Sequence, residues 1–165
     1  MLTLHVALSF SGLLVGALLL VDLLGSARRQ PTLAGALLFS TAIISVTGFA
    51  LPSPPGTPTP DPARILGVIE LVVIVIAALA LYLKHLTLAW RSIYIVSIVV
   101  AVYLNVFVTV VQAFLKVPFL HVLAPSGKEP PFVIAQLLTL ALFVVIGAMA
   151  LKRPRLAADM IKATI

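Results

Sequence analysis

An uncharged run from Ile93 to Leu115 constrains the fold of this chain most strongly. It is long enough to cross a bilayer as a helix, which takes about 20 apolar residues. Three polar residues interrupt it, Asn105, Thr109 and Gln112, and their spacings of four and three residues place them on one helical face. Because hydrocarbon penalises unsatisfied polar groups, we expect this face to point at other helices or at a cavity.

The composition assigns the whole chain to the membrane class. Of its 165 residues 62% are hydrophobic and only 10% are charged, whereas soluble domains are about 25% charged. We therefore expect the lipid bilayer to be its solvent. The net charge of +6 does not indicate a nucleic-acid partner, because the cations lie at the ends of the apolar runs. The lack of cysteine excludes disulfides, thiolate catalysis and cysteine-ligated metals.

Five apolar runs predict an all-α, polytopic transmembrane helix bundle that forms one domain over residues 1–165. The predicted spans are residues 3–24, 33–51, 65–83, 93–115 and 131–151. No Lys or Arg precedes the first run, so the charged start of a signal peptide is missing and we expect a retained helix. The alternative is a four-helix bundle with a cleaved or peripheral first helix.

The distribution of Lys and Arg predicts the orientation. With the N-terminus outside, eight of these residues lie on the inner side and three on the outer side. The inner set comprises Arg28, Arg29, Lys84, Arg91, Lys152, Arg153, Arg155 and Lys162. The outer set comprises Arg64, Lys116 and Lys128. Because cytoplasmic loops carry the excess of positive residues, we predict the N-terminus outside and the C-terminus inside.

Two segments outside the spans have a distinct composition. Residues 52–62 read PSPPGTPTPDP, and six prolines in eleven positions exclude a helix or a central strand. We expect a stiff, extended outer connector there; a ligand for an aromatic-grooved domain is the alternative. The basic tail after Leu151 is weakly amphipathic, and we expect it to lie on the membrane surface.

Polar side chains from four spans are predicted to lie at one depth. Those that lie about four to six residues below the outer ends of their spans are Thr47, Glu70, Gln112 and Gln136. Asn105 and Thr109 extend this layer toward the midplane. An ionisable residue inside a membrane is a functional-site hypothesis by default, so the layer could hold a proton, a lipid, a quinone or a small substrate. The other interpretation is interhelical hydrogen bonding that fixes the bundle.

A step of two glycines lies in the first span, where Gly12 and Gly16 form G-x-x-x-G. Small residues at this spacing let two helix backbones approach closely. The step is therefore a candidate for helix packing, either in a dimer seam or within the bundle.

Catalytic and metal-binding motifs are missing from the sequence. It contains no H-E-x-x-H, G-x-S-x-G, P-loop or G-x-G-x-x-G pattern, so we assign no catalytic residue and expect no enzyme. We interpret His5, His85 and His121 as interfacial anchors. Haem ligation and a metal held by His5 and His121 are weaker alternatives, and we expect neither a cofactor nor a metal.

Three segments resemble those of a group of small, uncharacterised bacterial inner-membrane proteins. They are SVTGFALP from Ser45, the stretch from Ala89 to Pro118, and EPPFVIAQ from Glu129. The group has no assigned activity, so the resemblance carries over no functional residue. It implies that this chain resides in a bacterial inner membrane.

Two functional hypotheses follow. In the first, the chain is a non-enzymatic interaction protein, either a small auxiliary subunit of a larger membrane complex or a homo-oligomer. In the second, it handles a small ligand, a lipid, a quinone or a proton at an outward-facing polar site around Glu70, Asn105 and Gln112. An enzyme acting on lipid or quinone substrates is a third and weaker hypothesis.

Overall fold

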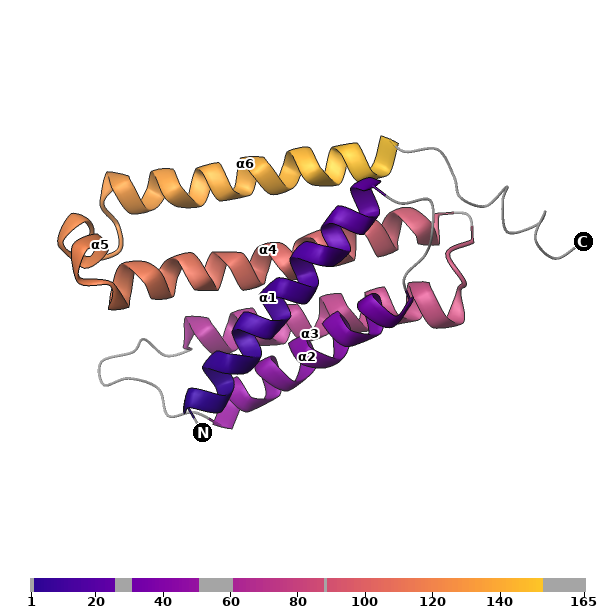
Figure 1. The fold of residues 1–165 in the computed structure, drawn as a ribbon, viewed down its shortest axis with the longest axis horizontal. Helices are drawn as coiled ribbons and strands as arrows, with labels where there is room; N and C mark the ends of the chain where they lie inside the picture. The colour runs from indigo at the N-terminus through magenta and orange to yellow at the C-terminus, as the bar shows by residue number, and fades with distance from the viewer. Residues whose placement is uncertain (1, 26–30, 51–60, 88, 153–165) are drawn as a thin grey trace, which may run out of the picture.

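The structure, a computed structural model, describes residues 2–25, 31–50, 61–87 and 89–152, with side chains from residue 8 onward. Over this part of the chain the fold is all-α (Figure 1). The α-helices are α1 (Leu2–Gly25), α2 (Pro31–Ala50), α3 (Pro62–Ala78), α4 (Trp90–Lys116), α5 (Pro118–Leu123) and α6 (Pro130–Lys152). A π-helical segment, η1 (Leu79–Leu83), continues α3.

Five helices are long and apolar enough to cross a membrane, which confirms the predicted all-α bundle of five spans. They are α1, α2, α3 with η1, α4 and α6. Helices α2, α3, α4 and α6 pack side by side in that order, and α1 lies across α2 and α4 (Figure 1). The N-terminus and α5 lie at one end of the bundle, and the α3–α4 turn and the last turn of α6 lie at the other. We call the latter the basic end, after Lys84, Arg91 and Lys152.

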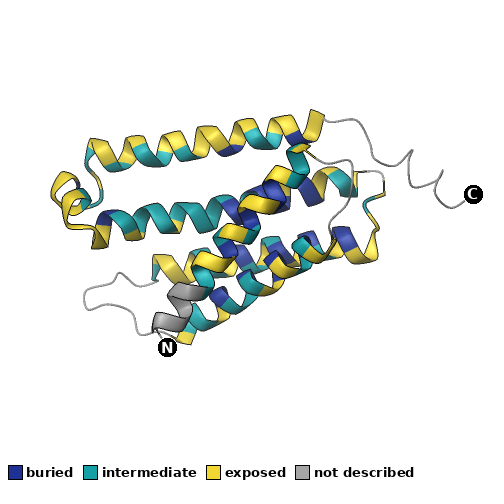
Figure 2. Cartoon of the chain, in the orientation of Figure 1, coloured by how far each residue is buried: buried dark blue, intermediate teal, exposed yellow. Residues whose placement is uncertain are grey.

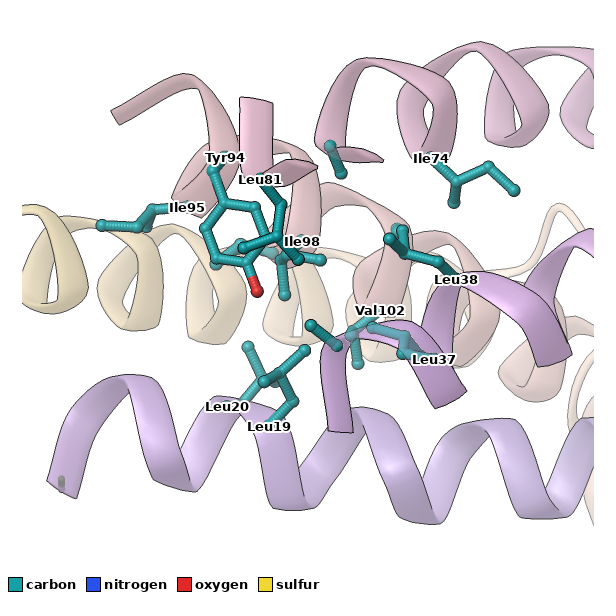
Figure 3. Close-up of a cluster of buried hydrophobic side chains, with 14 of the residues drawn as sticks. Leu19, Leu20, Leu37, Leu38, Ile74, Leu81, Tyr94, Ile95, Ile98 and Val102 are labelled. Atoms are coloured by element: carbon teal, nitrogen blue, oxygen red, sulfur yellow. The ribbon is translucent and has the colours of Figure 1, made fainter. Parts of the chain in front are cut away.

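Helix α4 is the centre of the bundle, because it contacts α1, α3 and α6. It contributes the largest set of buried side chains, which includes Tyr94, Ile98 and Val102. Leu19 of α1 and Leu37 of α2 pack into the same cluster (Figure 3). Lipid tails are as apolar as these side chains, so close van der Waals packing rather than the hydrophobic effect holds the spans together in a bilayer.

Helix α3 begins with a side-chain cap. The Asp61 carboxylate accepts a hydrogen bond from the Ala63 N–H at 2.9 Å, and Pro62 occupies the first turn, where its missing N–H costs nothing. Arg64 Nε lies 3.8 Å from Asp61 Oδ2, and an ion pair at the surface contributes little to stability. The start of α3 is therefore determined by local sequence.

Two elements go beyond the sequence prediction. Pro118 ends α4 and opens α5, since proline suits the first turn of a helix but not its interior. At the other end of the bundle, η1 closes with a bond from the Lys84 N–H to the Leu79 carbonyl. His85 and Leu86 follow with φ of 47° and 56°, a left-handed turn that leads the chain into α4.

Three predicted features lie outside the described residues: most of the proline-rich connector, Arg28 with Arg29, and the tail after Lys152.

Candidate functional site

A buried carboxyl group lies where α2, α3 and α4 meet. Glu70 of α3 is 9% exposed. The Ser45 hydroxyl of α2 donates to Glu70 Oε2 at 3.1 Å, and Asn105 Nδ2 of α4 donates to Glu70 Oε1. Asn105 Nδ2 also donates to the Ala101 carbonyl of its own helix at 3.0 Å. We call Ser45, Glu70 and Asn105 the Glu70 cluster; it joins three helices through side chains alone.

The donor types in the Glu70 cluster suit both protonation states of the acid. An amide nitrogen only donates, so the oxygen that faces Asn105 must accept in either state. A serine hydroxyl both donates and accepts, so Ser45 can pair with an ionised oxygen or with a protonated one. Both carboxyl oxygens are therefore satisfied within the chain, as the low-dielectric interior of a membrane requires.

The three residues of the polar face predicted on α4, Asn105, Thr109 and Gln112, have different surroundings in the structure. The Thr109 hydroxyl donates to the Asn105 carbonyl at 2.8 Å and so bonds to its own helix. Gln112 is exposed, which corrects the expectation that it points at other helices or a cavity. The predicted layer measures the depth of each residue from the ends of the spans 65–83 and 93–115. In the structure α3 begins earlier, at Pro62, and α4 continues to Lys116. The hydrogen bond between Asn105 and Glu70 places these two residues at one level, and Gln112 lies about two turns further along α4.

The other two members of the predicted layer make separate contacts. Gln136 Nε2 of α6 donates to the Phe107 carbonyl of α4 at 3.3 Å, which ties α6 to α4. Its Oε1 is buried and has no partner among the described residues. The Thr47 hydroxyl lies 2.7 Å from the Ile43 carbonyl and 3.1 Å from that of Ile44, both on its own helix. Of the six predicted site residues, the structure brings only Glu70 and Asn105 together as a side-chain pair.

Ser45 is the member of the cluster that the predicted layer omitted. It lies one helical turn after Thr41, and both side chains are buried. This spacing is the sequence signal that could have identified the inward face of α2. Thr41 Oγ1 has no hydrogen-bond partner in the described part of the chain.

Both glycines of the G-x-x-x-G step are buried against other helices of the same chain. A Cβ on Gly12 would lie 3.0 Å from Ile44 Cδ1 of α2. A Cβ on Gly16 would lie 3.0 Å from both Cγ atoms of Val102 on α4. The step therefore lets α1 approach α2 and α4 closely within one chain.

An apolar groove of about 340 Å³ lies between α4 and α6, and none of the residues of the Glu70 cluster lines it. Val96 and Tyr103 line it from α4, and Gly147, Ala148 and Leu151 line it from α6. Helix α6 contributes only Phe143 and Ala150 to the buried residues, and most of its surface is exposed (Figure 2).

The histidines form no metal site in the described structure. His85 and His121 are exposed at opposite ends of the bundle, and the side chain of His5 lies outside the described residues. Among the residues that the structure describes, no three His, Cys, Asp or Glu side chains gather in a group that could hold a metal ion.

Comparison of the chain with family models, with curated proteins and with solved structures finds no match.

Proposed function

We propose that this chain is a non-enzymatic integral membrane protein that acts as a small auxiliary subunit or a homo-oligomeric interaction protein of a bacterial inner membrane. Its N-terminus lies outside and its C-terminus inside. The observation that carries the proposal is that each carboxyl oxygen of Glu70 has a hydrogen-bond partner within the chain. The acid that lies deepest in a span accepts hydrogen bonds from α2 and α4 and so joins three helices of the chain.

Helix α6 supplies the interaction surface in this proposal. It packs mainly on α4, with a smaller contact to α1, and no other helix that the structure describes covers its remaining faces. Leu138, Leu142 and Val145 are more than half exposed along one side of it. A second copy or a larger partner subunit would cover this side; lipid alone would cover it in a monomer.

Site-directed crosslinking in the native membrane tests the proposal. A photoreactive residue replaces Leu138 of α6, and a matched control replaces Val72, which is similarly exposed on α3. We expect Leu138 to yield one adduct of defined mass, equal to a dimer or to one partner protein, and Val72 to yield none. Lipid adducts alone at both positions would overturn the proposal.

A second function, handling of a proton or a small ligand, is favoured by one observation. The Ser45 hydroxyl suits Glu70 in both protonation states, so the Glu70 cluster could release and rebind a proton without losing its hydrogen bonds. Glu70→Gln separates the two functions, because the amide keeps an acceptor for Asn105 and a donor for Ser45.

Proton flux into vesicles containing the purified chain is the readout for this second function. Flux in the wild type that Glu70→Gln abolishes, with unchanged thermal unfolding, would establish proton handling. If the wild type shows no flux and Glu70→Gln unfolds at the same temperature as the wild type, the structural role stands.

A further inference from the structure

We propose that the groove between α4 and α6 is a binding site for one anionic phospholipid. One of its acyl chains lies along the groove, and its phosphate lies at the basic end of the bundle. The site is independent of the Glu70 cluster and of the proposed interaction surface on α6.

The groove has the length and lining that an acyl chain needs. It runs from Val96 to Tyr103 along α4, which is roughly 10 Å at 1.5 Å per residue. One leaflet of hydrocarbon is about 15 Å deep, so the groove spans much of one leaflet. Helices α4 and α6 run antiparallel, so Val96 and Leu151 lie toward the basic end and Tyr103 lies deeper.

Aromatic rings form the deep end of the groove, and small residues open its middle. The rings of Tyr103 and Phe143 meet edge-on with centroids 5.7 Å apart. Gly147 and Ala148 face Val99 with little side-chain volume, so α6 leaves a hollow beside α4. The lining is almost wholly apolar, which excludes a polar solute and suits a hydrocarbon chain.

Charge at the mouth of the groove selects the headgroup. Lys152 follows Ala148 by one helical turn and Ser92 precedes Val96 by one turn, so both lie on the groove side at the basic end. Arg91 and Lys84 lie at the same end, and Lys84 Nζ stacks 5.4 Å from the centre of the Trp90 ring. Basic residues between transmembrane helices at the cytoplasmic face are typical binding sites for anionic headgroups.

Acidic residues do not cancel this charge. Asp22 of α1 is the acid at the basic end among the described residues. At the opposite end, by contrast, Asp61 and Glu129 accompany the three cations there. A lipid that carries a net negative charge is therefore favoured in the leaflet at the basic end.

Native mass spectrometry of the purified full chain tests this site with two probes, dioleoyl phosphatidylglycerol and dioleoyl phosphatidylcholine. We expect one phosphatidylglycerol to be retained at least about fivefold more tightly than phosphatidylcholine, the effect of about one headgroup cation. Lys152→Gln removes most of this preference, whereas Lys116→Gln at the opposite end does not. Equal retention of the two lipids by the wild type would overturn the proposal.

A filled groove provides the second test. Ala148→Phe places a ring in the groove, and Val72→Phe places the same ring on an exposed position of α3 that does not line it. We expect the first variant to lose retained phosphatidylglycerol and the second to keep it. Retention by a folded Ala148→Phe at the wild-type level would overturn the acyl-chain site. If that variant fails to fold, the Lys152→Gln comparison decides.

Discussion

Asn105 on α4 donates a hydrogen bond to Glu70 on α3, across 35 positions of sequence. Ser45 on α2 donates to the other oxygen of the same carboxyl group. Three spans are thus joined at one point, and in the bilayer core no water is present to replace these hydrogen bonds. The strength of such a junction in a bilayer is modest, at about 0.6–2 kcal/mol per bond, but its geometry determines how the three helices are rotated.

Replacing Asn105 with Leu removes this junction from α4. We expect the free energy of unfolding to fall by about 1–2 kcal/mol, because one Glu70 oxygen is left without its donor. The measurement is thermal unfolding in detergent. Thr109→Val is the matched control on the same helix, since the Thr109 hydroxyl bonds only to its own helix backbone. Equal unfolding temperatures for the two variants would count against a structural cluster.

Enlarging Gly16 tests the packing of α1. Gly16→Leu forces a side chain against Val102, whose methyl carbons lie 3.0 Å from the position of the new Cβ. Overpacking of this kind costs about 1–3 kcal/mol, so we expect a lower unfolding temperature. Gly25→Leu is the control, because no atom of the described residues lies within 4 Å of its Cβ position. If Gly16→Leu instead preserved stability but abolished self-association, α1 would be a dimer seam.

Much of the fold could be predicted from the sequence, because each span is an apolar run with its charges at the ends. Hydrocarbon leaves a single chain with few choices other than helices, since every backbone group must be satisfied internally. The uncharged run around Asn105 forms α4, which contacts α1, α3 and α6. The short helix α5 was not predicted, because its six residues are too few to form an apolar run; Pro118 occupies its first turn.

The candidate site was less predictable, because it depends on helix rotation and on relative depth. Several hydroxyls lie on α2, and sequence alone does not say which one faces α3. Ser45 reaches Glu70, whereas the hydroxyls of Ser40 and Thr47 bond to carbonyls of α2 itself. Helix α3 begins three residues before the predicted span, so Glu70 lies deeper than expected and pairs with Asn105, whereas Gln112 is exposed nearer the end of α4.

The orientation of the bundle can be tested with single cysteines, since the chain contains none of its own. Ser126→Cys labels the turn between α5 and α6, and Thr87→Cys labels the turn between η1 and α4. Both residues are exposed. We expect a membrane-impermeant thiol reagent to modify Ser126→Cys in intact cells and Thr87→Cys only after permeabilisation. The reverse pattern would place the N-terminus inside.

The turn before α6 carries a pH-dependent contact outside the spans. Desolvation acts to raise the pKa of Glu129, but hydrogen bonds from the Ser126 side chain and from nearby backbone N–H groups lower it to about 2. The Ser126 and Lys128 N–H groups each lie 3.0 Å from a carboxylate oxygen. Because the pKa is lowered on folding, the contact stabilises the turn fully above the ordinary value of 4.5.

We therefore expect the turn to loosen only as the pH falls from about 4.5 toward 2. Hydrogen exchange at the Ser126 and Lys128 amides reports this directly: protection stays constant between pH 7 and pH 5 and declines below. Glu129→Gln removes the ionised acceptor, so we expect lower protection than in the wild type between pH 7 and pH 5. A loss of protection between pH 7 and pH 5 in the wild type would contradict this assignment.

Native mass spectrometry of the chain, extracted gently from its own membrane, tests the central claim most directly. An interaction protein leaves the membrane with its partner, so we expect the mass of a homo-oligomer or of a complex with one stoichiometric protein. Bound phospholipid is compatible with either result. A monomer that carries no protein partner would contradict the account, and a retained small molecule lost in Glu70→Gln would establish the ligand-handling function in its place.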